Sequence, residues 1–121
     1  MNRTRAFNNL LAQTPASKLV FTEHFRARKR SRGISEAMVE DFLYNRQKDL
    51  VYAEETTTER GLARYKLFYD ASKRKTILIV LDVESGFLRI VTCLLMDKRL
   101  QQEAVRNAAR YARLAGRLRR S

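Results

Sequence analysis

The sequence predicts an α+β fold with two N-terminal helices, a four-stranded and mainly antiparallel sheet, and a long basic C-terminal helix. Apolar residues recur at helical spacing before residue 49, form alternating or continuous runs from there to residue 96, and return to helical spacing after residue 97. Helices that precede a block of strands, rather than alternating with them, indicate segregated layers. Because the chain has 121 residues, of which 45% are hydrophobic, one core fits it and a second domain does not.

Two short elements are expected at the start of the chain. Residues 4–12 predict a short helix that ends near Pro15. The apolar residues 19–21 predict either a brief strand or an anchor in the core. We therefore treat residues 1–17 as an N-terminal extension and begin the folded domain at residue 18.

The two main helices have recognisable ends. Thr22 is suited to cap the first helix, Glu23 lies in its first turn, and Gly33 is suited to terminate it. Ser35 is expected to start the second helix, which carries an apolar stripe at the spacing of a core-facing surface. The stripe consists of Met38, Val39, Phe42 and Leu43.

Four strands are expected after residue 49. Residues 50–52 and 62–69 predict the first two, the second of them with alternating apolar and polar side chains. Residues 76–83 and 87–96 are nearly continuous apolar runs, joined by a hairpin turn at residues 84–86. Strands that are apolar on both faces belong in the middle of a sheet covered by helices.

The segment from residue 98 to residue 120 predicts the last helix, with one basic and one apolar face. At 100° per residue, five arginines fall within a sector of roughly 80°. These are Arg106, Arg110, Arg113, Arg117 and Arg120. The opposite side gathers Leu100, Ala104, Ala108, Tyr111, Ala115 and Leu118. The arginine face is consistent with contact to nucleic acid, with a solubilising outer surface, or with docking of an acidic protein.

Positive charge is concentrated in two segments of the chain. Residues 1–33 and residues 98–121 each carry 8 basic and 1 acidic side chains, whereas the residues between them carry 9 and 11. Concentrated blocks create local potentials that attract a polyanion, which scattered charge does not. Nucleic acid is therefore the leading class of partner.

The first basic constellation lies between residues 24 and 32. On a helix, His24, Arg28 and Arg32 recur at every fourth position and form one ridge, while Arg26 and Arg30 lie on another side. Like charges four residues apart cost a helix roughly 0.2–0.5 kcal/mol per pair, so local stability does not explain the pattern. The alternative interpretation is a solvated surface helix whose histidine turns inward to a hydrogen bond in the core.

A further candidate group lies on the second expected strand. Arg64 and Lys66 share one face of it, and Tyr65 and Tyr69 share the other. The cations belong either to a nucleic-acid site or to a half-exposed edge strand that uses charge to block aggregation.

Several classes of function are disfavoured by what the sequence lacks. There is no phosphate-binding glycine loop, zinc-ligand spacing or Gly-x-Ser-x-Gly motif, so no metal or cofactor is expected. The single cysteine, Cys93, excludes an intrachain disulfide. No window approaches 18 consecutive apolar residues, and residues 1–16 do not make a secretory leader, so we expect no membrane association and a cytoplasmic location.

The segment around the first basic constellation resembles a prokaryotic family. It contains His24 and Arg28 as His-x-x-x-Arg, then Arg-Gly-Ile-Ser at residues 32–35, then a short helix with Val39. In these features it resembles an uncharacterised family related to the RelE/ParE toxins, over about residues 18–96. The resemblance implies a RelE-like domain over residues 18–97 and messenger-RNA cleavage without a metal, or gyrase inhibition as in the ParE branch. RNA is favoured over DNA as the ligand, although the sequence does not choose between them, and the ribosome and an acidic antitoxin are candidate partners of the basic tail.

Metal-independent RNA cleavage would require a base, an acid and cations around the scissile phosphate. His24 could act as base or acid, which are the usual roles of histidine in proton transfer. Arg28, Arg32 and Arg64 could clamp the phosphate, with Lys66 as a further charge or as the acid. Two other functions remain open, a noncatalytic protein that binds nucleic acid or the ribosome and a module that docks an acidic protein.

Overall fold

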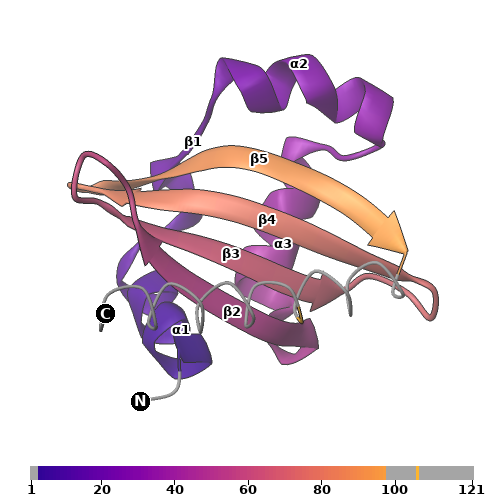
Figure 1. Cartoon of the computed structure of the whole chain (residues 1–121), viewed down its shortest axis with the longest axis horizontal. Helices are drawn as coiled ribbons and strands as arrows, with labels where there is room; N and C mark the ends of the chain where they lie inside the picture. Colours follow the sequence, from indigo (N-terminus) through magenta and orange to yellow (C-terminus); the bar gives the residue numbers. More distant parts are fainter. Residues whose placement is uncertain (1–2, 98–105, 107–121) are drawn as a thin grey trace, which may run out of the picture.

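The computed structural model describes residues 3–97 and Arg106, and within them it contains three α-helices and five strands (Figure 1). The helices are α1 (Arg3–Gln13), α2 (Glu23–Arg32) and α3 (Glu36–Asn45). The strands are β1 (Leu19–Phe21), β2 (Leu50–Thr57), β3 (Ala63–Asp70), β4 (Lys75–Glu84) and β5 (Phe87–Asp97).

All five strands form one mixed sheet in the order β1-β5-β4-β3-β2. Strands β2 to β5 are joined by short turns and pair antiparallel with their neighbours. Strand β1 pairs in parallel with β5, so that Leu19 lies opposite Leu88 and Phe21 lies opposite Ile90. The first strand of the chain, β1, therefore forms one edge of the sheet, beside the last strand, β5.

The α+β class holds, but the layout predicted from the sequence is wrong. The sheet has five strands instead of four because residues 19–21 form a parallel edge strand, and a three-residue segment carries too little periodicity to predict such a distant pairing. Three helices precede β2 instead of two, because α1 buries Phe7 and Leu11 in the common core. The long helix predicted over residues 98–120 lies outside the described residues except for Arg106, which is helical and exposed.

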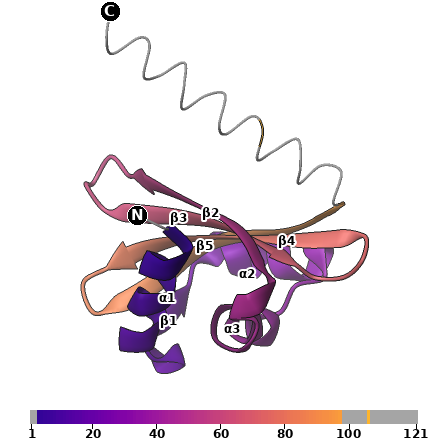
Figure 2. The same ribbon diagram turned by 90° about the horizontal axis from the view of Figure 1, so that it is seen from below.

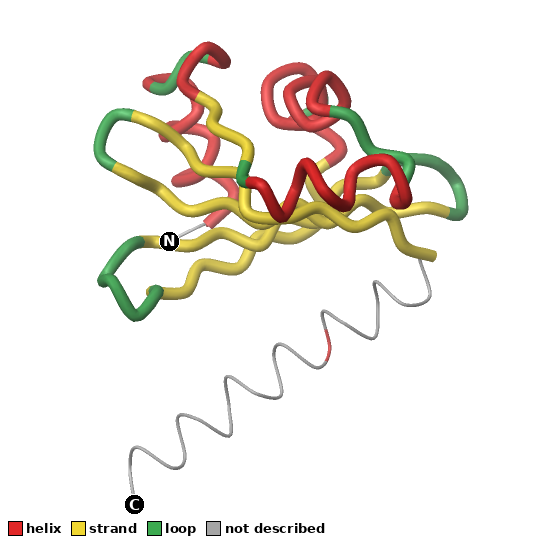
Figure 3. Tube along the Cα trace, turned by 90° about the horizontal axis from the view of Figure 1, so that it is seen from above, coloured by secondary structure: helices red, strands yellow, loops and turns green. Residues whose placement is uncertain are grey.

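Two of the helices cover one face of the sheet and the third lies along its edge. Figure 2 shows α1 and α3 below the sheet, and Figure 3 shows α2 running beside β5. The core lies between the sheet and α1 and α3, where Phe7 contacts Tyr65 and Phe42 contacts Tyr69. None of the described helices is both long and apolar enough to cross a membrane.

The predicted ends of the helices are confirmed. The side-chain oxygen of Thr22 accepts a hydrogen bond from the backbone N–H of Phe25 at 3.2 Å, and that of Ser35 accepts one from Met38 at 3.1 Å. Gly33 has a φ of 66°, and the N–H of the next residue returns to the carbonyl of Lys29 at 3.0 Å, which is a Schellman ending. The chain therefore leaves α2 by the conformation that glycine adopts most readily.

The strands alternate between the core and a second face, which we call the helix-free face because none of the helices of residues 3–97, α1, α2 and α3, covers it (Figure 2). Its side chains differ along the strands. One end is charged and carries Arg64, Lys66, Asp82, Glu84 and Arg89. The other end is apolar and carries Tyr52, Phe68, Leu78, Leu94 and Met96.

Candidate nucleic-acid interface

Helix α2 concentrates positive charge along the edge of the sheet. Five of its ten residues are arginine or lysine and one is acidic. It packs through Phe25, which is buried and lies 4.8 Å from Phe21, measured between ring centroids. His24, Arg26 and Arg28 are exposed on this helix. Like charges destabilise a helix, and α2 buries little apolar surface. The stability of the helix therefore does not explain its charge.

One carboxylate faces two of the α2 cations. The carboxylate oxygen Oε1 of Glu36 lies 3.4 Å from Nε of Arg26 and 4.0 Å from Nζ of Lys29. The side chain of Arg26 remains 62% exposed. A single negative charge neutralises at most one of these cations, and exposed ion pairs of this kind bind weakly enough to be exchanged for a phosphate. Arg26 and Lys29 together therefore keep excess positive charge.

Arg32 serves the architecture of the sheet edge. Its guanidinium group donates to the Thr92 hydroxyl at 2.9 Å and to the Cys93 carbonyl at 2.7 Å. The hydroxyl of Thr22 donates to the carbonyl of Val91 at 3.0 Å on the same edge. Strand β1 ends at Phe21, so these two side chains of the α2 segment take over the hydrogen bonding that β1 no longer supplies to β5.

Arg64, Asp82 and Arg89 lie directly opposite one another on three neighbouring strands of the helix-free face. Arg64 holds both carboxylate oxygens of Asp82, with distances of 2.6 Å from Nε and 3.0 Å from Nη2. Arg89 donates to the second of these oxygens from Nη2 at 2.9 Å. Two arginines thus share one carboxylate, which leaves the three groups with a net positive charge.

The carboxylate of this triad lies beneath its cations. Asp82 is fully buried, whereas the side chains of Arg64 and Arg89 are each 34% exposed. The hydrogen bond from Arg64 is the main cause that lowers the pKa of Asp82, and the same bond raises the pKa of Arg64. Asp82 therefore stays ionised and fixes the orientation of both guanidinium groups.

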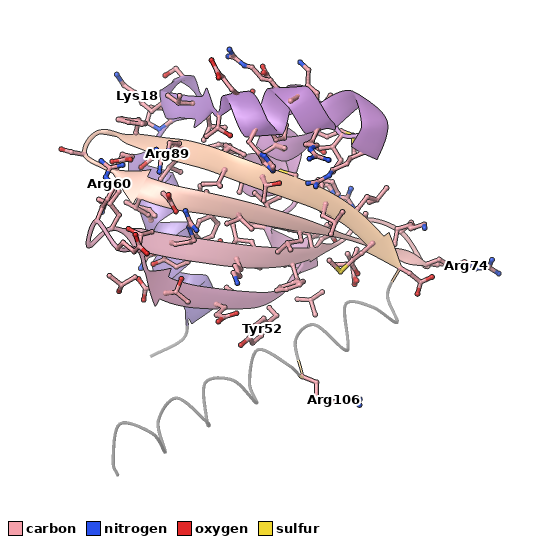
Figure 4. All side chains as sticks on the ribbon, turned by 45° about the horizontal axis from the view of Figure 1, so that its top comes forward. Lys18, Tyr52, Arg60, Arg74, Arg89 and Arg106 are labelled. Atoms are coloured by element: carbon pink, nitrogen blue, oxygen red, sulfur yellow. The ribbon has the colours of Figure 1, made fainter. Side chains whose placement is uncertain are left out.

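A polar hollow with a volume of about 430 Å³ opens beside this triad. Its wall consists of Thr57, Thr58, Glu59, Arg60, Arg64, Asp82 and Arg89. Arg60, in the β2–β3 turn, lies 3.3 Å from Glu84 and is 63% exposed, while the side chain of Glu84 is 11% exposed. We call Arg60, Arg64 and Arg89 together the arginine cluster. In Figure 4 the labelled Arg60 and Arg89 lie at one end of the sheet, and Arg74 lies at the other.

The structure brings some of the predicted site residues together and separates others. Arg64 and Lys66 share the helix-free face, as predicted, and Tyr65 and Tyr69 point into the core on the opposite face. His24 and Arg28 lie one turn apart on α2, at the edge of the sheet. Arg32 is bound to the β5 edge and Arg64 to Asp82, so these two guanidinium groups are engaged in different parts of the sheet.

The remaining predicted residues lie outside what the structure describes. The side chain of Arg30 is one of them, and so are Arg110, Arg113, Arg117 and Arg120. Arg106 is described as an exposed helical residue. The nucleic-acid contacts predicted for these residues, and the catalytic roles predicted for the others, stay predictions.

Three residues of this interface were not identified from the sequence. Asp82 and Arg89 are isolated charges in otherwise apolar runs, one on each side of the turn at residues 84–86. A two-residue turn at Ser85 and Gly86, in which Glu84 pairs with Phe87, places them opposite each other, whereas the turn predicted at residues 84–86 places Asp82 opposite Leu88. Arg60 belongs to a polar loop and has no such signal, because its approach to Glu84 depends on the folded sheet.

The described residues contain no group of three or more His, Cys, Asp or Glu side chains that could hold a metal ion. Comparison of the chain with protein-family models, with curated proteins and with solved structures found no match. Among the described residues, positive charge is concentrated on α2 and in the arginine cluster, and Asp82 and Glu84 neutralise part of the charge of the cluster.

Proposed function

We propose that this protein binds nucleic acid, RNA in preference to DNA, through phosphate contacts made by the exposed cations of α2. The observation that carries the proposal is the charge of this helix, five cations and one acid among ten residues, on a surface where Glu36 faces two of the cations. Arginine presents planar donor pairs that match phosphate oxygens. The preference for RNA comes from the resemblance of the motif at residues 24–35 to the relatives of the RelE/ParE toxins.

Binding without cleavage accounts for more of the geometry than catalysis does. The predicted catalytic set needs Arg32 and Arg64 at one phosphate, but Arg32 is bound to the β5 edge and Arg64 to Asp82 on the helix-free face, in different parts of the sheet. One observation favours the catalytic alternative, since His24 lies exposed one turn before Arg28, close enough on a helix to act on a phosphate that Arg28 binds. RNA cleavage is therefore the second candidate.

The proposal includes a cytoplasmic location, where RNA and ribosomes are accessible. An acidic protein, such as an antitoxin, is the competing partner, because carboxylates and phosphates both suit arginine. A pull-down separates them, since retention of an acidic protein after nuclease treatment would favour protein docking.

The test is binding of the full chain to a fluorescently labelled single-stranded RNA oligonucleotide, followed by anisotropy, with DNA of the same sequence in parallel. We expect affinity for RNA at low salt and a steep loss as salt rises, because binding releases counterions. Absence of binding at low salt would refute the proposal. Incubation of the same RNA tests the second candidate, which predicts a product ending in a 2′,3′-cyclic phosphate that His24→Ala abolishes.

A further inference from the structure

We infer that the arginine cluster on the helix-free face is a second phosphate-binding site for the same nucleic-acid strand. This inference rests on the proposed function and adds a contact point away from α2. It identifies Arg60, Arg64 and Arg89 as the residues that bind the phosphate and the polar hollow beside them as the space that the phosphate enters.

The cluster keeps hydrogen-bond donors for a ligand. Arg64 uses Nε and Nη2 for Asp82, Arg89 uses Nη2 for Asp82, and Arg89 Nε lies 3.8 Å from a carboxylate oxygen of Glu84. Within the described part of the chain, these contacts leave Nη1 of both arginines for an oxyanion. Because Asp82 already holds the two guanidinium groups in place, binding a phosphate costs little of the side-chain entropy that free arginines would lose.

The arginines of the cluster are more exposed than the carboxylates beneath them, which favours binding of an anion from solvent. Asp82 is fully buried and the Glu84 side chain is 11% exposed, while Arg60 is 63% exposed. A ligand entering the hollow therefore meets guanidinium groups before it meets these two carboxylates. Glu59 is the opposing charge, since it is exposed and forms part of the wall of the hollow. Its removal should strengthen phosphate binding.

The position of the cluster relative to α2 indicates that its ligand is a nucleic-acid strand and not a free anion. The backbone N–H of Thr22, which caps α2, donates to the carbonyl of Ile90 at 3.1 Å, and Arg89 is the preceding residue of β5. Consecutive Cα atoms are about 3.8 Å apart, so the first turn of α2 and the cluster lie on either side of the same short piece of β5. Nucleic acid repeats its phosphates at short intervals and can engage both places at once.

The experiment compares two exposed arginines in turns at opposite ends of the sheet. Arg60→Gln removes a charge from the cluster, and Arg74→Gln removes the same charge from the β3–β4 turn (Figure 4). We expect Arg60→Gln to weaken binding of single-stranded RNA about three- to tenfold and Arg74→Gln to change it much less. Glu59→Gln should strengthen binding. Melting temperatures of all three variants should stay close to that of the parent chain.

Each outcome bears on one claim. Equal losses from Arg60→Gln and Arg74→Gln, while the parent chain binds RNA, would overturn the second site and leave the proposed function standing. Failure of the parent chain to bind RNA would instead remove the proposed function. A parallel arm uses inorganic phosphate against chloride at matched ionic strength. One result would show that the cluster binds free phosphate and that the inference about a nucleic-acid strand is wrong. In that result, phosphate raises the melting temperature of the parent chain but not of Arg60→Gln, and Arg60→Gln and Arg74→Gln bind RNA equally.

Discussion

Asp82 is the residue on which the helix-free face depends. It is a fully buried carboxylate on the central strand of the sheet, and the guanidinium groups of Arg64 and Arg89 satisfy both of its oxygens. Removing one partner from such a group leaves the others without compensation. The order of the cationic surface and the stability of the sheet are therefore linked through one side chain.

Asp82→Asn should lower the free energy of unfolding by about 1–3 kcal/mol near neutral pH, because it removes charged hydrogen bonds. The pKa of Asp82 is lowered in the folded state, so its contribution is complete above about pH 4, the ordinary pKa of an unfolded Asp, and is lost as pH falls through the lowered value. Denaturant unfolding at several pH values should show the difference between parent and variant shrinking below about pH 4. A difference that does not depend on pH would contradict the assignment.

The two core tyrosines of β3 should respond differently to loss of the hydroxyl. The Tyr65 hydroxyl donates to Glu55 at 3.0 Å, and burial is the main cause that raises its pKa to about 12. The Tyr69 hydroxyl is buried with no hydrogen-bond partner among the described residues, and burial raises its pKa as well. Tyr65→Phe should cost about 0.5–1.5 kcal/mol of stability, whereas Tyr69→Phe should be neutral or stabilising. Equal losses in denaturant unfolding would show that the Tyr69 hydroxyl has a partner.

Helix α2 takes the place of a strand along the β5 edge from Val91 to Cys93. Thr22 and Arg32 bind carbonyl groups of β5 beyond the end of β1, while Phe25 anchors the helix in the core. An unsatisfied edge would invite pairing with another chain. The same helix therefore protects the edge of the sheet and presents cations outward.

This division of roles predicts opposite effects for two arginines of α2. Arg32→Gln should lower the melting temperature by about 4–8 °C for each kcal/mol lost with its two hydrogen bonds, and should leave the RNA affinity of the folded protein nearly unchanged. Arg26→Gln should cost at most about 1 kcal/mol, because its pair with Glu36 is exposed, and should weaken RNA binding. Thermal unfolding and anisotropy on the same samples measure both quantities. The assignment fails if Arg32→Gln weakens RNA binding more than Arg26→Gln does.

Local signals in the sequence predicted most elements, and distant pairings were the ones missed. Thr22, Gly33 and Ser35 mark helix ends by chemistry that acts within a few residues, so α2 and α3 could be placed. The three residues of β1 pair with a strand almost seventy positions away, and no local pattern in the sequence predicts this pairing. The fold class was therefore predictable, and the number and order of the strands were not.

The candidate site shows the same limit. The basic character of residues 26–32 and the shared face of Arg64 and Lys66 follow from composition and from the two-residue period of a strand. That Arg32 would bind the β5 edge, and that Arg64 would meet Asp82, depends on how helix and strands lie beside one another. The sequence therefore predicts which residues are cationic, but it does not predict which of these cations form hydrogen bonds that stabilise the fold.

Across the whole molecule, the described positive surfaces flank the same strand. The cations of α2 lie along the edge of β5, and the arginine cluster extends from β5 across the helix-free face. The chain as a whole carries a formal net charge of +12, while the segment from residue 34 to residue 97 has more acidic than basic side chains. Within the described residues, the excess positive charge therefore lies in the N-terminal segment that contains α2, and the arginine cluster is a local group of cations within a segment of slight negative charge.

The most direct measurement is the salt dependence of RNA affinity for the parent chain, for the double variant Arg26→Gln/Arg28→Gln and for Arg74→Gln as the matched control. Each phosphate contact contributes about −0.7 to the slope of log K against log salt for a single strand. If the cations of α2 bind phosphates, the double variant loses about 1.4 from the magnitude of the slope, while Arg74→Gln keeps the parent value. Identical slopes for the parent and the double variant, with both proteins folded, would contradict the claim that α2 binds the phosphate backbone.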